Sequence, residues 1–378
     1  MSATPPEGRF RARDLGIVLG TLPTGPLNGI TDVAGVRVGQ TTLIAGDGPL
    51  VVGEGPVRTG VTAIVPGGAE AATEPVFAGS HVLNGNGEMT GLAWIEEAGL
   101  LSSPIAITNT HSVGVVRDAM IAHEVARGRH REVSWSLPVV AETWDGGLND
   151  INGFHVRPEH LHAALDTATG GPVAEGGVGG GTGMVCHGFK GGIGTASRVV
   201  TSEGDRWTVG VLVQANYGQR HQLRIDGVPV GREISATDVP TPWSGGAMPP
   251  PGSGSIIVVI ATDAPLLPHQ CQRLAQRATI GIARVGGVGE DSSGDLFLAF
   301  STANRGLEPQ SLAPVAVRML PSPAMSPLFA AAAEATEEAI VNALCVATTM
   351  VGVDGRTAHA LPHDLLRQAM ARYGRRGD

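Results

Sequence analysis

The stretch GSGSIIVVIATD, residues 252–263, joins a proline-rich run to a β-branched run. The run before it, residues 240–251, cannot pair into a sheet because proline lacks the N–H that a strand donates. From Ser255 onward the continuous apolar residues predict a fully buried strand. Cleavage of the Gly254–Ser255 bond would make Ser255 a new N-terminus, a nucleophilic hydroxyl with a basic amine on the same residue. The alternative is a buried strand that merely begins with serine.

Composition predicts a large apolar core with few aromatic rings. Apolar residues make up 42% of the 378 residues and aromatic residues only 4%, so Val, Ile, Leu and Ala must fill that core. Glycine occurs 55 times, about twice its average share of roughly 7%, which indicates tight turns and close backbone approaches. No linker divides the chain, so we expect one domain over residues 1–378. The net charge of −9, without a basic block, argues against nucleic acid as a partner.

Cysteine usage and hydropathy indicate a cytoplasmic protein. Cys186, Cys271 and Cys345 are far apart and form no CxxC, so neither a disulfide framework nor a cysteine zinc site is expected. Residues 1–14 contain charges and prolines but no apolar segment, so no secretory signal is visible. No run of about 18 apolar residues occurs, so no membrane span is expected.

The hydrophobic pattern alternates strands with a few amphipathic helices, which by itself indicates an α/β or α+β fold. A hairpin is expected over residues 28–43, and a short helix or strand end over 92–101. Strands are expected over residues 60–65, 105–110, 138–143, 208–216, 255–261 and 296–302. Helices are expected over residues 113–126, 160–167, 268–285, 326–348 and 362–373.

Three motifs suggest other chemistries and fail on their context. Glycine-rich residues 176–183 lack the preceding strand and following helix of a dinucleotide fingerprint, so no cofactor is expected and a glycine-rich hairpin is favoured. His123-Glu124 is not followed by the second histidine of a zinc protease, and His160 and His162 diverge on a helix, so no metal is expected. The loop before Gly294 has no upstream histidine and aspartate with the context of a Ser-His-Asp triad.

Five motifs in a fixed order carry a family resemblance over residues 13–349. They are RDLGI (13–17), NGITDVAGVRVG (28–39), ETWDG (142–146), the glycine-rich residues 176–194 and SGD (293–295). In this order, with the Gly254–Ser255 junction, they resemble the DmpA/BapA family of L-aminopeptidase/D-esterases and β-peptidyl aminopeptidases. The resemblance implies a four-layer αββα sandwich of the Ntn-hydrolase-like kind, related to ornithine acetyltransferase.

The resemblance also implies roles for individual residues. Ser293 and Asp295 would form a relay in which Asp295 accepts a hydrogen bond from Ser293, and Ser293 faces the nucleophile Ser255. Family members that cleave β-peptides carry glutamate where this chain has the shorter Asp295. From the residues alone, a capped turn before the strand at Leu296 is the favoured interpretation of 293–295.

Two further positions match the substrate-binding part of the family pattern. Glu142 matches the carboxylate that holds the free amine of the substrate, and Trp144 stands where the family has tyrosine or tryptophan. Asn216, at the end of a predicted strand, is a candidate oxyanion donor through its side-chain amide. A turn asparagine is the alternative, because Gly218 follows.

The resemblance implies a self-processing aminopeptidase without a cofactor. Cleavage would give chains 1–254 and 255–378, and Ser255 would attack a small peptide, amide or ester substrate with a free amine. The base is either the Ser255 α-amine or the relay pair, and a homo-oligomer, a tetramer, is expected.

The competing interpretations are an acetyltransferase like the ornithine enzyme, a dehydrogenase, and a catalytically silent binding protein of the same fold. The acetyltransferase uses threonine as its nucleophile, whereas this chain has serine. Whether L-, D- or β-amino acid derivatives are preferred stays open.

Overall fold

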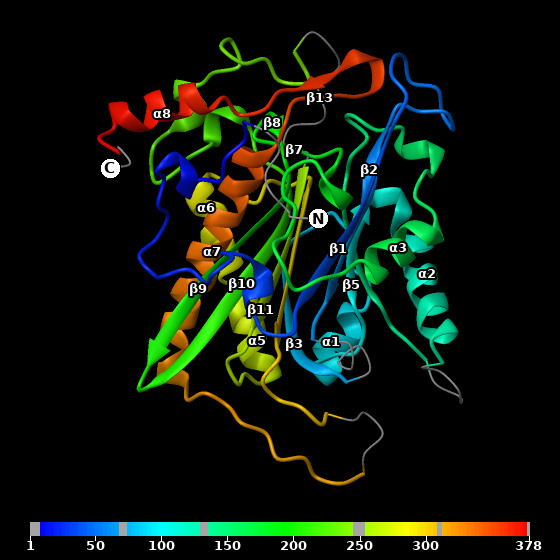
Figure 1. Ribbon diagram of the computed structural model, residues 1–378, viewed down its shortest axis with the longest axis vertical. Helices are drawn as coiled ribbons and strands as arrows, with labels where there is room; N and C mark the ends of the chain where they lie inside the picture. Colours follow the sequence, from blue (N-terminus) through cyan, green and yellow to red (C-terminus); the bar gives the residue numbers. More distant parts are fainter. Residues whose placement is uncertain (1–7, 68–73, 129–134, 245–253, 308–311, 376–378) are drawn as a thin grey trace.

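Two β-sheets packed face to face form the centre of the molecule, and helices cover the outer face of each sheet (Figure 1). The computed structural model describes residues 8–67, 74–128, 135–244, 254–307 and 312–375. Within these ranges no helix is both long and apolar enough to cross a lipid bilayer. The layers follow the order helix, sheet, sheet, helix, which confirms the expected α+β sandwich.

The smaller sheet has the strand order β1-β2-β5-β6, and the larger has the order β4-β3-β12-β11-β10-β9. The smaller sheet consists of β1 (Arg37–Ala45), β2 (Val57–Val65), β5 (Ile105–Asn109) and β6 (Val139–Thr143). The larger consists of β4 (Leu100–Leu101), β3 (Val76–Gly85), β12 (Ser293–Ser301), β11 (Gly254–Thr262), β10 (Asp205–Asn216) and β9 (Gly192–Ser202). Outside the sheets, β7 (Val185–Cys186) pairs with β8 (Phe189–Lys190), and β13 (Met350–Val351) pairs with β14 (Thr357–Ala358).

The helices form the two outer layers. Those that pack on the smaller sheet are α2 (Val113–Ala126) and α3 (Pro158–Asp166). On the larger sheet lie α5 (Pro268–Ala275) and α7 (Met325–Val346), with α6 (Ala278–Val285) against α7. The remaining helices are α1 (Leu92–Ala98), α4 (Val230–Glu233) and α8 (His363–Arg372).

Side chains of the central strand β11 alternate between two cores. Ile256, Val258 and Ile260 belong to the core under the helices, whereas Ile257 and Val259 belong to the core between the sheets. Successive side chains of a strand point to opposite faces, so a strand that is buried on both faces has a continuously apolar sequence. This burial explains why residues 255–261 predict a strand, and it places Ser255 on the face between the sheets.

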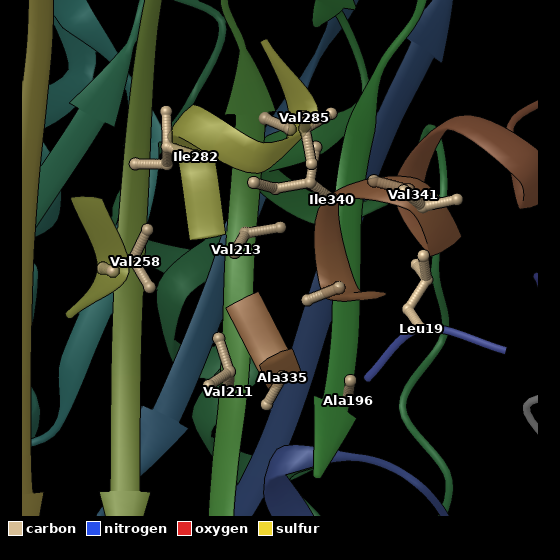
Figure 2. Packing of buried hydrophobic residues seen from close by; sticks show 14 of the residues in the cluster. Leu19, Ala196, Val211, Val213, Val258, Ile282, Val285, Ala335, Ile340 and Val341 are labelled. Atoms are coloured by element: carbon tan, nitrogen blue, oxygen red, sulfur yellow. The ribbon is translucent and has the colours of Figure 1, made fainter. Parts of the chain in front are cut away.

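Figure 2 shows how closely the alanine-rich helix α7 approaches the sheet, with Val211 and Val213 of β10 beside Ala335 and Ile340 of the helix. A Cβ at Gly194 of β9 would lie only 1.9 Å from the Ala339 carbonyl oxygen. Small residues on both partners therefore allow the helix to lie directly on the strands.

Two predicted elements differ from the structure. The helix expected over 268–285 is two helices, α5 and α6, because α5 packs on β3 and β12 whereas α6 turns to pack along α7. The hairpin expected over 28–43 is a 3₁₀ turn, Ile30–Asp32, followed by β1, whose hairpin partner is β2. The partner of α6, helix α7, is distant in the sequence, whereas β2, the partner of β1, is the next strand along the chain.

Candidate active site

Ser255 lies near the start of β11, in the interior of the larger sheet, and its side chain is buried. Its hydroxyl donates a hydrogen bond to the Gly254 carbonyl oxygen at 2.5 Å and accepts one from the Gly294 N–H at 3.1 Å. The oxygen that would attack therefore lies against the one peptide group that self-cleavage would break.

Gly254 adopts a backbone conformation that only glycine tolerates well, with φ +156°. A Cβ at this position would lie 2.7 Å from the Asn216 carbonyl oxygen and 2.8 Å from the Tyr217 Cα. The glycine before Ser255 thus lets the chain pass close to the end of β10, where no side chain would fit. The residues immediately before Gly254, including Ser253, lie outside the described residues.

The sheet register gives Ser255 its two neighbours. Asn216 of β10 is its antiparallel partner, and Gly294 of β12 is its parallel partner. The Asn216 side chain is held at both ends, because the Val185 N–H donates to its Oδ1 at 2.8 Å and its Nδ2 donates to the Trp144 carbonyl oxygen at 2.9 Å. A fixed amide beside a nucleophile suits an oxyanion donor, and the turn interpretation of Asn216 is wrong because the residue ends a strand.

Ser293 and Asp295 form the predicted pair, in which the Ser293 hydroxyl donates to Asp295 Oδ1 at 2.6 Å. The interpretation of residues 293–295 as a capped turn is wrong, because they are the first residues of β12. Burial raises the pKa of the Asp295 carboxyl, against the lowering effect of hydrogen bonds from Ser293, from the Ile256 N–H and from Asn84.

The register between β11 and β12 determines on which face of the sheet the Ser293–Asp295 pair lies. Ser293 is paired with Gly254 and not with Ser255, so strand alternation places Ser293 and Asp295 on the helix-facing side of the sheet. No hydrogen bond joins the Ser293 and Ser255 hydroxyls within the described part of the chain. The expectation that Ser293 faces the nucleophile hydroxyl is therefore not met. The pair instead approaches the backbone of β11, where the Ile256 N–H donates to Asp295.

Glu142 lies at the end of β6, in the other sheet, and is buried. Its carboxylate accepts hydrogen bonds from the Glu88 N–H at 2.9 Å and from the Thr110 hydroxyl. A Cβ at Gly87 would lie 3.1 Å from Glu142 Oε1 and 3.2 Å from the Gly294 Cα, so one turn touches both the carboxylate and the neighbour of Ser255. Burial raises the pKa of Glu142, against the lowering effect of the hydrogen bonds from Thr110 and Glu88.

A half-open pocket begins at Gly254 and Asn216. Trp144 and Trp243 form part of its wall, and their rings stack with centroids 6.4 Å apart and an angle of 26° between planes. The hairpin predicted over residues 176–183 is wrong, because a 3₁₀ turn at Gly179–Gly181 lies there and the hairpin β7–β8 follows it. Val185 of β7 lines the pocket. A nucleophile, a fixed amide, a buried carboxylate and an open pocket therefore converge at one end of the sandwich.

Sequence reasoning missed three residues of this site. Thr110 stands at the end of a predicted strand, the same signal that pointed to Asn216. Asn84, which donates to the Glu290 carbonyl oxygen at 2.7 Å and to Asp295 at 3.5 Å, lies near the end of β3, a strand that is not predicted from the sequence. Trp243 gives no signal, because it stands inside the proline-rich run. In the part of the chain that the structure describes, no three His, Cys, Asp or Glu side chains gather as they would around a metal ion.

The sequence profile of peptidase family S58 matches residues 28–358 of this chain. The chain belongs to peptidase family S58. The β-peptidyl aminopeptidase BapA of Sphingosinicella microcystinivorans is a family S58 relative that is 53% identical over 375 residues, covering 97% of this chain and 93% of the relative.

Solved structures agree with this family S58 assignment. A β-aminopeptidase from Burkholderia sp. is 54% identical and superimposes with a TM-score of 0.88, over 97% of this chain and 99% of the other. The L-aminopeptidase D-Ala-esterase/amidase of Ochrobactrum anthropi, described as a variant of the Ntn hydrolase fold, is 47% identical with a TM-score of 0.90 over the same shares. These similarities confirm the family resemblance, the fold and the enzyme class, a hydrolase of the aminopeptidase type.

Proposed function

We propose that this chain is a self-processing aminopeptidase in which Ser255 attacks a carbonyl group next to a free amine. The observation that carries the proposal is the position of the Ser255 hydroxyl, 2.5 Å from the Gly254 carbonyl oxygen and held by the Gly294 N–H. The substrates are small peptides, amides or esters with a free amino group. β-Amino acid and D-amino acid derivatives are the first to try, since the relatives' names include a β-peptidyl aminopeptidase and a D-Ala-esterase.

Self-processing would proceed by an acyl shift. The Ser255 oxygen bonds to the Gly254 carbonyl carbon, the bond from that carbon to the Ser255 nitrogen breaks, and the hydroxyl proton ends on that nitrogen. Water then hydrolyses the ester, which leaves a Gly254 carboxylate and a free Ser255 amine. The products are chains 1–254 and 255–378, held together because β10 and β3 of the first chain pair with β11 and β12 of the second.

In the mature enzyme, the same oxygen would attack the substrate carbonyl and form an acyl-enzyme that water hydrolyses. Asn216, the strand partner of Ser255, would act as an oxyanion donor, which typically contributes on the order of 10² to 10³ in rate. The new α-amine of Ser255 is the nearest base, because it belongs to the same residue. The Ser293–Asp295 pair approaches the backbone beside that amine and would tune its basicity.

Glu142 would bind the free amine of the substrate. Its buried carboxylate already accepts from the Glu88 N–H and the Thr110 hydroxyl, and one more donor could complete its contacts. A positively charged amine is the donor that most favours the ionised form of a buried carboxylate. Trp144, two residues on and 40% exposed, would line the adjoining pocket.

Two further properties belong to this proposal. A homo-oligomer, expected to be a tetramer, is supported by residues 312–319, a segment without helix or strand that exposes apolar side chains at Leu312, Val315, Val317 and Met319. A cytoplasmic location is supported by three buried cysteines that are all free. Light scattering at micromolar concentration checks the first, and fractionation of the producing cells checks the second.

The deciding experiment follows processing and turnover together. Purified wild type should give two bands on a denaturing gel, with the smaller beginning at Ser255, and should hydrolyse a free-amine anilide but not its N-acetylated form. Ser255→Ala should give one uncut band and no turnover. A small fragment beginning at Ser253 or Gly254 would refute this cleavage site, and equal rates on free and acetylated substrates would refute the aminopeptidase.

A further inference from the structure

Glu142 and the aromatic pocket lie on opposite flanks of Ser255. The turn that contacts Glu142 also touches Gly294, on the β12 side of the nucleophile. The pocket is lined by Asn216 and Tyr217, on the β10 side. In an aminopeptidase substrate, the part that carries the free amine and the leaving group are attached to opposite sides of the carbonyl carbon. If Glu142 holds the amine, the leaving group therefore points into the aromatic pocket.

The wall of that pocket is built around Trp243. Its ring stacks on the Trp144 ring and lies directly on the backbone at Gly147, where a Cβ would be only 2.5 Å from the Trp243 ring. The Arg356 guanidinium lies 5.7 Å from the centroid of the Trp243 ring. Two stacked indoles offer a flat apolar surface, which suits a planar apolar group more than a flexible polar one.

Trp243 belongs to the segment that leads toward the cleavage site, yet a buried arginine ties this segment to the body of the protein. The Arg220 guanidinium lies 3.4 Å over the Phe189 ring. Among the described residues, it donates hydrogen bonds to backbone carbonyls, those of His187, Gly188, Ile234, Ser235 and Val239. Cleavage after Gly254 breaks none of these bonds, so the mature enzyme keeps Trp243 at the pocket.

We propose that Trp243 is a specificity-determining residue on the leaving-group side, where it favours planar apolar leaving groups over small aliphatic ones. This inference rests on the proposed aminopeptidase function. A leaving group is lost when the acyl-enzyme forms, so Trp243 should affect acylation, measured as kcat/KM. It should leave deacylation unchanged, because the leaving group has departed by then. Substrates that share an aminoacyl group form the same acyl-enzyme and therefore deacylate at the same rate.

The test compares two leaving groups on one aminoacyl group, a p-nitroanilide and a methylamide. The aminoacyl group is the one that the wild type hydrolyses fastest. In Trp243→Ala the ratio of kcat/KM for the anilide to that for the methylamide should fall roughly threefold to tenfold relative to wild type, the range expected for an aromatic contact. Trp243→Phe should keep the ratio within about twofold, because a flat ring remains.

Two controls make the result specific. Trp135→Ala removes an exposed tryptophan that precedes β6 and lies at the opposite end of that strand from Glu142, so the ratio should not change. A pair of anilides with different aminoacyl groups should respond equally to Trp243→Ala. Trp243→Leu, which keeps apolar bulk without a ring, is measured in parallel in case the alanine variant does not fold, and should show the same fall in ratio.

An unchanged leaving-group ratio in both Trp243→Ala and Trp243→Leu would overturn the inference. So would a change confined to the pair that differs in the aminoacyl group, because Trp243 would then lie on the amine side. Failure of the proposed function would look different, since wild type itself would hydrolyse no free-amine substrate.

Discussion

Ser255 and Gly294 stand opposite each other on the parallel strands β11 and β12, and the Gly294 N–H donates to the Ser255 hydroxyl oxygen at 3.1 Å. Glycine is required there because a Cβ at position 294 would lie 2.5 Å from the Asn86 carbonyl oxygen. The hydroxyl is thus oriented by a backbone donor, whereas Ser293 and Asp295, on either side of Gly294, point to the other face of the sheet. This separation of roles leads to distinct expectations for each residue.

Gly254→Ala should slow self-cleavage at least about tenfold, because the new methyl group collides with the Asn216 carbonyl and the backbone must leave its glycine-only conformation. The measurement is a time course of precursor and fragment bands on a denaturing gel. Gly114→Ala in α2 is the matched control, since a Cβ there meets nothing within 4 Å. Wild-type cleavage by Gly254→Ala would show that this backbone conformation plays no part in processing.

Ser293→Ala should lower turnover of an anilide, by at most the factor of about 10² to 10⁴ that general acid–base assistance contributes, because the pair tunes the α-amine that acts as the base. Self-cleavage is a single event with hours available, so it should still finish or nearly finish. Asp295→Asn should behave like Ser293→Ala, and the double variant should be little worse than either, because a hydrogen-bonded pair acts as a unit. Steady-state kinetics beside band conversion measures both effects; wild-type turnover by Ser293→Ala would remove the pair from the mechanism.

Glu142→Gln should lower kcat/KM for a free-amine anilide by about tenfold to a hundredfold, through KM, because a charge-assisted hydrogen bond to the amine is lost. Burial raises the pKa of Glu142, and the ionised form binds the amine. Wild-type kcat/KM should therefore rise with pH through an apparent pKa above that of an ordinary carboxyl, and this acid limb should vanish in the variant.

Glu88→Gln is the matched control for this prediction. It removes an exposed carboxylate of the same turn, whereas only the Glu88 backbone N–H contacts Glu142. Its acid limb should persist and move slightly to lower pH, because the Glu88 charge is a minor cause of the raised pKa of Glu142. An acid limb that persists unchanged in Glu142→Gln would assign the limb to another group.

Asp145→Asn tests a buried carboxyl next to Trp144. Burial raises the pKa of Asp145 to about 7, against the lowering effect of hydrogen bonds from Thr59, Asn149 and Asn109. A raised folded-state pKa contributes stability that is full below about pH 4 and is lost as pH rises through 7. The free energy of unfolding of the protein with Asp145, relative to that of Asp145→Asn, should therefore fall between pH 4 and 7, by at most about 1.4 kcal/mol per pH unit.

The measurement is denaturant unfolding of both forms in the uncut Ser255→Ala background, at several values between pH 4.5 and 8. The neutral Asn149 amide donates to Asp145 Oδ1, so Asn149→Ala should weaken the protein without removing this pH dependence. A stability difference that does not vary with pH would mean that Asp145 stays ionised throughout.

The local secondary structure and the chemistry at the cleavage site could be predicted from the sequence. The helix over residues 113–126 coincides with α2, and the strand over 255–261 lies within β11, because periodicity and β-branched runs are local properties. The Ser293–Asp295 hydrogen bond and the position of Asn216 beside Ser255 followed from motifs and their family resemblance.

Only the tertiary structure decided which atoms meet. A one-residue offset between β11 and β12 puts Gly294, and not Ser293, beside the nucleophile hydroxyl, because register determines the face on which every side chain lies. The break between α5 and α6 depends on packing against α7, and Trp243 lies at the pocket with its ring stacked on that of Trp144. These relationships join residues that are far apart in the chain, and hydrophobic patterning carries no information about such long-range contacts.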